Sequence, residues 1–150
     1  MAKTAAIRFL EAAGCSFTLC EYKYVDRGGT RASSEALGVT EHCVIKTLIL
    51  ETVSKSPLIA LMHGDHEVST KALARYIGTK SIAPCSPATA QKRSGYQVGG
   101  TSPFATRKQM PTYLQESIVH LELLYVNAGK RGLLACMTPA ALTGGDTGLD

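Results

Sequence analysis

The stretch Val44 to Leu50, "VIKTLIL", is the part of the sequence from which the fold can be worked outward. β-Branched and leucine side chains fill it except at Lys46, so it predicts a buried strand. Side chains alternate between the two faces of a strand, which places Lys46 on the same face as Val44 and Leu48. An ammonium group there must find a partner, reach water or lose its proton. Two interpretations stay open: a lysine that extends outward to solvent, or one at the rim of a pocket that meets a substrate oxygen or phosphate.

The flanking sequence predicts an α/β (α+β) fold. The turn "SKSP" at 54–57 favours a hairpin between the first strand and the next one. Helices are expected over 3–13, from Ser34 to near Gly38, over 70–77, over 87–93 and from Thr138; strands are expected over 17–24, 44–51, 58–62, 82–83, 96–98, 112–114 and 118–126. The order is not a regular βαβ alternation, so we expect one domain over residues 1–150 with a mixed, mostly antiparallel, barrel-like sheet and surrounding helices. Residues 25–34 are expected to form a loop and the tail 144–150 to be flexible.

Composition limits the class of protein. The chain has 150 residues, of which 45% are apolar and 19% charged, as in a globular domain. Its apolar runs are shorter than the ~18 residues of a membrane span, and no signal peptide is evident, so we expect a soluble cytoplasmic protein. The five cysteines are an odd number without a C-x-x-C pair, which favours reduced thiols over a disulfide framework.

Basic residues come in doublets beside glycine-containing segments. The net charge is only +4, but doublets occur at Lys92-Arg93, Arg107-Lys108 and Lys130-Arg131. Such pairs are either solvated faces or phosphate contacts, because backbone N–H groups and basic side chains suit phosphates together.

A glycine pair stands in "SGYQVGGTSPF", residues 94–104. Gly99-Gly100 allows unusual backbone angles and close approach, and Thr101 and Ser102 add hydroxyl groups. The segment is either a tight turn or a loop whose N–H groups hold a carbonyl oxygen or a ribose. It matches neither the P-loop nor the Rossmann fingerprint.

Histidines and an aspartate cluster in "MHGDHE", residues 62–67. The spacing of His63 and His66 would suit a metal ion on a helix, but Gly64-Asp65 predicts a turn, and no third ligand is apparent. We therefore expect no metal and no cofactor. A serine-hydrolase elbow, G-x-S-x-G, is absent as well.

Four motifs in order resemble the YbaK/EbsC family: 38–50, 64–78, 94–104 and 127–132. These proteins are aminoacyl-tRNA deacylases, related to the editing domain inserted in bacterial prolyl-tRNA synthetases, and the resemblance covers roughly residues 5–143. It implies a barrel-like α/β domain that hydrolyses the ester of a mischarged tRNA without a cofactor. Cys-tRNA(Pro) is the first expected substrate. The alternatives are another small amino acid such as alanine, a hydrolase of simple amino-acid esters, or a module that binds aminoacyl-tRNA or a synthetase without catalysis.

The resemblance also assigns residues. It implies that activity depends most on Lys46 and that the aminoacyl pocket is lined by Tyr22, Thr47, Gly99, Gly100, Thr101 and Ser102. The expected partners are mischarged tRNA and, second, prolyl-tRNA synthetase, with acceptor-stem phosphates held by Lys92, Arg93, Arg107, Lys108, Lys130 and Arg131. One departure stands out, because Leu134 occupies the position at which the cysteine-specific branch carries an aspartate.

Overall fold

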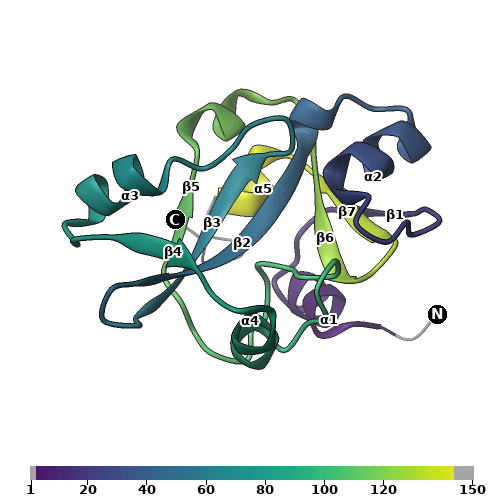
Figure 1. Cartoon of the computed structure of the whole chain (residues 1–150). Coiled ribbons are helices and arrows are strands. Elements are labelled where there is room, and N and C mark those ends of the chain that lie inside the picture. Colours follow the sequence, from purple (N-terminus) through teal and green to yellow (C-terminus); the bar gives the residue numbers. More distant parts are fainter. Residues whose placement is uncertain (1–2, 144–150) are drawn as a thin grey trace.

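The strand that contains "VIKTLIL" lies in the interior of the sheet. In the computed structural model, which describes residues 3–143, strand β2 (Val44–Thr52) pairs antiparallel with β3 (Pro57–His63), so the expected hairpin is confirmed. On its other side β2 runs parallel to β6 (Leu124–Lys130), and its far end also pairs with β4 (Ile82–Pro84) (Figure 1). Strand β2 thus pairs with three other strands and forms the centre of the sheet.

The remaining elements extend this sheet and cover it. They are the helices α1 (Ala5–Ala12), α2 (Gly29–Leu37), α3 (Thr70–Ile77), α4 (Pro87–Ser94) and α5 (Pro139–Thr143), the short 3₁₀ helices η1 (Glu41–Cys43) and η2 (Glu116–His120), and the strands β1 (Thr18–Glu21), β5 (Thr112–Leu114) and β7 (Leu133–Met137). The strand order is β1-β7-β6-β2-β3-β5, with β4 off this path.

The sheet is mixed, as expected, but it is open. Four pairings among the described residues are antiparallel, and two, β2 with β6 and β3 with β5, are parallel. The strands at the two ends, β1 and β5, have four and three residues and do not pair with each other. Antiparallel pairings are thus in the majority, as expected, but the expectation of a barrel-like sheet is wrong, because no pairing among the described strands closes the path.

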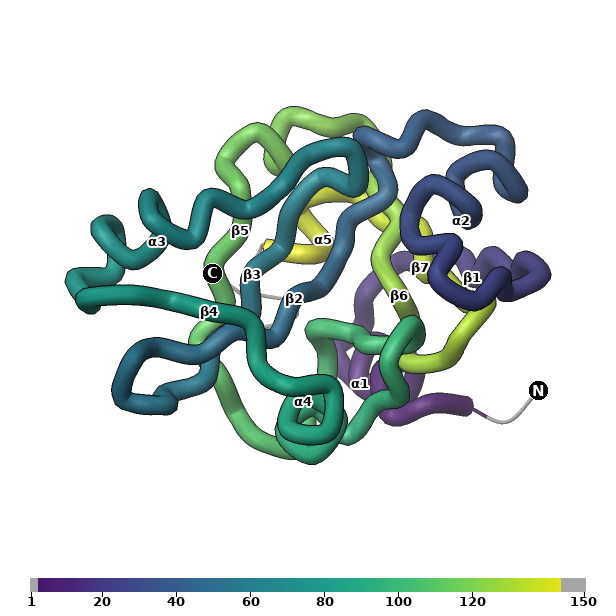
Figure 2. Tube along the Cα trace, in the orientation of Figure 1, coloured from purple at the N-terminus to yellow at the C-terminus, as the bar shows by residue number. Residues whose placement is uncertain are grey.

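Apolar side chains fill both faces of β2. Ile45 and Ile49 belong to the larger core, which also contains buried residues of α1 and α5. Leu50 belongs to a smaller cluster with residues of β3, α3 and β4. The tube view shows α5 behind the β2–β3 hairpin and α3 beside it (Figure 2). Because both faces are covered, a charged side chain on β2 can reach water only near the ends of these layers.

Local signals predicted several helix ends correctly. The Ser69 hydroxyl accepts a hydrogen bond from the N–H of Ala72 at the start of α3, and Ser86 does the same for α4. Gly78 follows the end of α3 in the left-handed conformation that ends many helices. No helix within residues 3–143 has the length and apolar character needed to cross a membrane.

Four local expectations are wrong. Helix α2 begins at Gly29, inside the expected loop, and residues 96–98 form a turn region rather than a strand. The expected strand 118–126 divides into η2 and the beginning of β6, and β7 was not expected at all. These elements depend on packing partners that are distant in the sequence. The tail 144–150 lies outside the described residues.

Candidate active site

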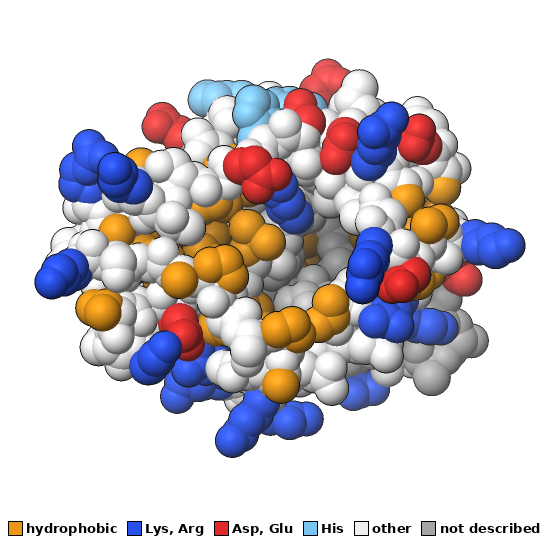
Figure 3. Space-filling view, viewed as in Figure 1, with side chains coloured by type: hydrophobic (Ala, Val, Ile, Leu, Met, Phe, Trp, Pro, Cys, Tyr) orange, Lys and Arg blue, Asp and Glu red, His pale blue; other side chains and the backbone are white. Residues whose placement is uncertain are grey.

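A pocket of about 450 Å³ opens beside the first half of β2. Its walls come from the segment after β1, the beginning of α2, the turn at 98–101, and the hairpin of β6 and β7. The space-filling view shows the hollow, with apolar side chains and charges of both signs around its mouth (Figure 3). Its volume suits a small ligand or the end of a larger one.

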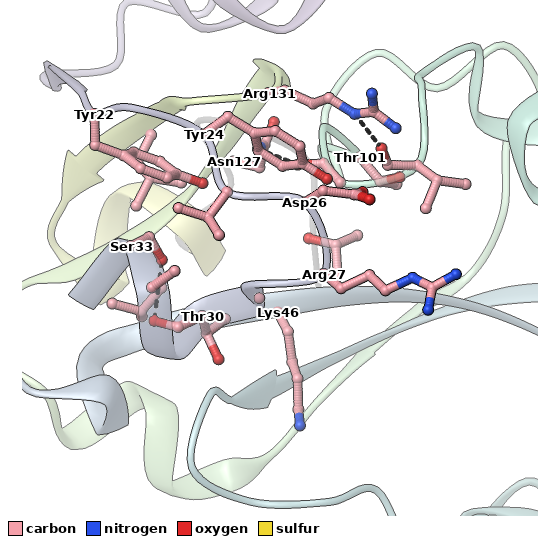
Figure 4. Close-up of a pocket in the computed structure, with 18 of the residues that line it drawn as sticks. Tyr22, Tyr24, Asp26, Arg27, Thr30, Ser33, Lys46, Thr101, Asn127 and Arg131 are labelled. Carbon is pink, nitrogen blue, oxygen red and sulfur yellow. Dashed lines mark hydrogen bonds between the residues drawn. The ribbon is translucent and has the colours of Figure 1, made fainter. Parts of the chain in front are cut away.

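Lys46 lines this pocket, and its ammonium group lies toward the rim. The side chain is 20% exposed, and Nζ lies 3.6 Å from the carboxylate of Glu67, which is 96% exposed. Figure 4 shows the side chain extending away from Tyr22 and Tyr24. An ion pair with so exposed a partner is weak. Lys46 therefore fits both interpretations of the sequence: its aliphatic stem lines the pocket, and its ammonium group extends to the solvent-exposed rim.

The hydroxyl group of the neighbouring Thr47 is unusual because it is buried without a partner. Thr47 lines the pocket, and its Oγ1 has no hydrogen bond to any other residue within 3–143. Leaving a buried hydroxyl unsatisfied costs about 1–3 kcal/mol. Because this oxygen has almost no exposed surface, a ligand in the pocket would reach it only after the Thr47 side chain rotates.

The glycine pair is explained by two different close contacts. Gly99 lines the pocket with φ of +88°, and a Cβ there would lie 2.5 Å from the hydroxyl of Tyr24. Gly100 is buried, and a Cβ there would lie 2.8 Å from the backbone nitrogen of Arg131. Its N–H donates to the carbonyl of Gln97, so Gly100 cannot offer this group to an ester oxygen.

Ser102 also lies outside the pocket lining. It is fully buried, and its hydroxyl accepts a hydrogen bond from the N–H of Phe104. The structure thus brings together five of the expected residues, Tyr22, Lys46, Thr47, Gly99 and Thr101. It does not place Gly100 and Ser102 among the lining residues, contrary to the expectation; these two shape the turn.

Burial raises the pKa of the Tyr22 phenol, which lines the pocket near the end of β1. The hydroxyl of Ser33 opposes this shift, and the nearby Tyr24 adds to it. Tyr22 therefore stays neutral at ordinary pH, and its O–H can donate a hydrogen bond to a ligand.

Several lining residues were missed by reasoning from the sequence. Asp26 is the only acidic residue among the described residues that line the pocket, and Arg27 beside it has φ of +60°, in the left-handed region. Non-glycine residues held there cluster at functional sites. The charged pair in "VDRG" was the available signal, but the segment was interpreted only as a loop.

Asn127 holds two walls of the pocket together. Its side-chain oxygen accepts hydrogen bonds from the N–H groups of Gly129 and Lys130, at 2.6 and 3.1 Å. Its amide nitrogen donates to the carbonyls of Lys130 and Gly99. This residue begins the motif at 127–132, so its role could have been suspected from the sequence.

The basic doublets divide into exposed and engaged cations. The N–H of Lys108 donates to the carbonyl of Arg93 at 2.8 Å, so two doublets lie side by side at the end of α4. There Lys92, Arg107 and Lys108 are exposed, as is Lys130 near the pocket. In Figure 3, Lys and Arg side chains gather along the lower edge, near α4.

The other two cations of the doublets are engaged within the protein. Arg93 is only 18% exposed, and its Nη1 lies 2.9 Å from the carboxylate of Glu51. Arg131 lines the pocket, donates from Nε to the carbonyl of Val98 at 2.7 Å, and places its guanidinium 4.9 Å from the ring centre of Tyr24. The expectation that all six cations are free for phosphates therefore applies to four of them.

His42 lies beside Asp65 and His66, a neighbour that the sequence did not suggest for this histidine cluster. Nδ1 of His42, in η1, lies 2.9 Å from Oδ1 of Asp65, and Nε2 of His66 lies 3.6 Å from the same oxygen. Partial burial raises the pKa of Asp65, but the hydrogen bond with His42 and the attraction of both histidines outweigh it, so this pKa is lowered. His63 is buried and contacts Ser117 instead.

Comparisons with known proteins point to one family. The family described as the aminoacyl-tRNA editing domain matches residues 29–144. A protein of Enterococcus faecalis, provisionally assigned as the Cys-tRNA(Pro)/Cys-tRNA(Cys) deacylase EbsC, is 30% identical over 141 residues, 93% of this chain and 86% of that protein. A proline–tRNA ligase of Thermodesulfovibrio yellowstonii is 36% identical over 66 residues, which are 42% of this chain and 12% of the ligase.

Solved structures share the fold. The hypothetical protein APE2540 superposes with a TM-score of 0.88 at 20% identity, covering 97% of this chain and 95% of that one. A protein provisionally described as a trans-editing enzyme for prolyl-tRNA synthetase gives a TM-score of 0.80 at 20% identity, covering 95% and 94%. The sequence match over most of the chain and the shared architecture agree: this chain belongs to the aminoacyl-tRNA editing domain family.

Proposed function

We propose that the protein is a deacylase that hydrolyses the ester of a mischarged tRNA, with Lys46 as its catalytic residue. The observation that carries the proposal is the position of this lysine. Its stem lies in the wall of the pocket, and its only ion-pair partner within the described residues is the solvent-exposed Glu67. The ammonium is therefore free to exchange that partner for an incoming anion.

The ester would lie between the first half of β2 and the turn at 98–101. Ester hydrolysis builds negative charge on the carbonyl oxygen, and a positioned cation stabilises that charge. Lys46 supplies the cation in this proposal, and the buried, unpartnered hydroxyl of Thr47 would donate a hydrogen bond to the substrate after its side chain rotates toward the pocket. Attack would come from a bound water or from a thiol of the substrate itself, so no nucleophile of the protein is required.

The amino group of the substrate also needs a partner. An aminoacyl ester carries an α-ammonium group near neutral pH, and an unpaired cation is costly inside a pocket. Asp26 can meet it, being the acidic residue among the described lining residues. On this proposal Asp26→Asn raises KM more than it lowers kcat.

The first substrate to test is Cys-tRNA(Pro). The E. faecalis relative is provisionally assigned to cysteinyl-tRNA, and Leu134, only 4% exposed, gives this pocket an apolar wall. A thiol is a small, weakly polar group that suits such a wall. Alanine or another small side chain would fit the same wall and is the alternative.

The exposed cations would hold the acceptor stem. Lys92, Arg107 and Lys108 lie together, and Lys130 ends β6 next to Arg131, which lines the pocket. Phosphate binding through four cations makes affinity fall steeply with salt, with a slope of roughly −3 in log–log form. Prolyl-tRNA synthetase is proposed as a second partner, which would deliver the mischarged tRNA.

The test is a deacylation assay on a panel of tRNAs charged with cysteine, alanine, serine and proline, using wild type and Lys46→Ala. We expect hydrolysis of at least one mischarged tRNA, lost in the variant. Unchanged turnover by Lys46→Ala would remove this lysine from the mechanism. Binding of every tRNA without turnover by wild type would favour a non-catalytic module, and turnover of simple esters alone a small-molecule hydrolase.

A further inference from the structure

We propose that His42, Asp65 and His66 form a binding site for a divalent transition-metal ion, outside the pocket. The three residues come from η1 and from the turn after β3, and none of them lines the pocket. Figure 3 shows histidine side chains gathered at the upper edge of the molecule. The site does not depend on the proposed deacylase activity.

The donor atoms already have nearly the required spacing. One ligand atom from each residue lies within 4.8 Å of the other two. Oδ1 of Asp65 is 2.9 Å from Nδ1 of His42 and 3.6 Å from Nε2 of His66. A tetrahedral ion with bonds of about 2.0–2.1 Å holds its donors about 3.4 Å apart, so small side-chain rotations complete the geometry.

A buried histidine fixes the orientation of His42. The ring of His63 stacks on that of His42, with centroids 3.7 Å apart and an angle of 6° between the planes. Nδ1 of His63 contacts the backbone carbonyl of His42 at 2.7 Å, so this nitrogen carries a proton, and Nε2 lies 2.7 Å from the hydroxyl of Ser117. Both ring nitrogens of His63 are therefore engaged, so His63 is not itself a ligand. Its stacked ring instead holds the ring of His42 in one plane.

The ligand set selects the class of ion. Two imidazoles and one carboxylate suit zinc, cobalt, nickel or copper, whereas magnesium and calcium prefer oxygen ligands alone. The side chains of the three residues are 42%, 40% and 56% exposed, so an ion can enter from solvent and keep a water as its fourth ligand.

An ion at this site would join two segments that lead into and out of the β2–β3 hairpin. His42 lies just before β2, and Asp65 and His66 lie just after β3. The next residue in the turn is Glu67, the partner of Lys46. Metal binding would thus stabilise the folded chain and restrain the turn that carries Glu67.

The experiment uses tag-free, metal-stripped protein titrated with Co²⁺ and followed by its visible absorption, with Zn²⁺ titration by calorimetry. We expect one equivalent to bind and Zn²⁺ to raise the Tm of wild type. His42→Gln and His66→Gln should each weaken binding about tenfold or more and remove the Tm shift. His120→Gln, which changes an exposed histidine outside the cluster, is the matched control and should bind as wild type does.

Two results would overturn the proposal. The first is no binding by wild type. The second is full binding by His66→Gln, above all with the absorption band of cobalt–thiolate bonds, which would place the ion on cysteines. Because His66 is exposed, its variant should fold, and circular dichroism without metal checks this. If His42→Gln does not fold, the result with His66→Gln decides alone.

Discussion

Two of the ion pairs on strand β2 differ in almost every respect. Near its beginning, Lys46 faces Glu67 across 3.6 Å, and Glu67 is 96% exposed. Near its end, Glu51 meets Arg93 at 2.9 Å, with side chains that are only 14% and 18% exposed. The pair Lys46–Glu67 lies at the mouth of the pocket and is called the open pair. The pair Glu51–Arg93 links β2 to α4 and is called the closed pair.

The difference shows how the same charges can serve structure or function. Arg93 also donates to the sulfur of Cys85 and to the carbonyl of Lys55, so its guanidinium makes three hydrogen bonds within the protein. Removing Arg93 would leave Glu51 with only the exposed Lys55 as a partner, which compensates a largely enclosed carboxylate incompletely. Among the residues that the structure describes, Lys46 has only its exposed partner Glu67, so its charge can move to a ligand at little cost.

The largest expected effect comes from removing the charge at the open pair. Lys46→Met keeps an apolar stem in the wall but loses the ammonium, so kcat/KM for the edited tRNA should fall on the order of 10²–10³-fold. Steady-state deacylation measures this, and thermal unfolding should show a Tm close to that of wild type. The activity control is Lys55→Met, which removes an exposed lysine that pairs with Glu51 at 3.1 Å and does not line the pocket. Wild-type activity in Lys46→Met would mean that the open pair is as structural as the closed one.

Breaking the closed pair should have the opposite outcome. Arg93→Ala leaves Glu51 without its enclosed partner, so Tm should fall by several degrees while the remaining folded protein keeps its kcat. Differential scanning calorimetry and single-turnover assays separate the two effects. Lys92→Ala changes the exposed neighbour in the same helix turn and should leave Tm unchanged. An equal Tm in both variants would contradict the structural role of Arg93.

Acid should weaken the closed pair. Hydrogen bonds with Lys55, and then with Arg93, hold the pKa of Glu51 below its ordinary value of 4.5. Its contribution to stability is therefore present above pH 4.5 and is lost as the pH falls through the lowered folded-state pKa. Tm values of wild type and Glu51→Gln should differ at pH 7 and converge in acid. A constant difference across this range would argue against the charge of Glu51 as the cause.

The smallest effect is expected from the exposed partner of Lys46. Glu67→Gln removes a negative charge from the mouth of the pocket, so kcat/KM for tRNA should rise by less than about fivefold. The comparison variant is Glu35→Gln, which loses an exposed carboxylate on α2 that does not line the pocket. A large loss of activity in Glu67→Gln alone would show that this pair, too, is needed intact.

Local patterns predicted the fold best where the sequence contains its own partners. The β2–β3 hairpin joins two consecutive strands through a short turn, the serine caps of α3 and α4 involve residues three positions apart, and all are confirmed. Helix α2 was missed because Gly28, Gly29 and its serines are weak helix formers, and the helix forms with Ser33 and Ser34 buried. Strand β7 was missed because five apolar residues after a glycine do not by themselves indicate a strand.

The residues of the candidate site were also predicted only in part from the sequence. The resemblance of motifs identified Lys46, Thr47 and Gly99, which the structure gathers in one pocket. It could not identify Asp26, which lies just before α2 in the segment that was expected to be a loop. It also counted Arg93 and Arg131 as free cations, since a sequence does not show which distant groups a side chain will meet.

The sequence by itself determined the central hairpin, the helix caps, the family and the lysine to examine first, because each depends on residues close together or on a motif kept in order. Only the tertiary structure decided that the sheet is open, that Gly99 packs against Tyr24, and that His42 lies beside Asp65 and His66. The physical reason is that burial, partner availability and metal-ligand spacing arise between segments that the chain brings together only when it folds.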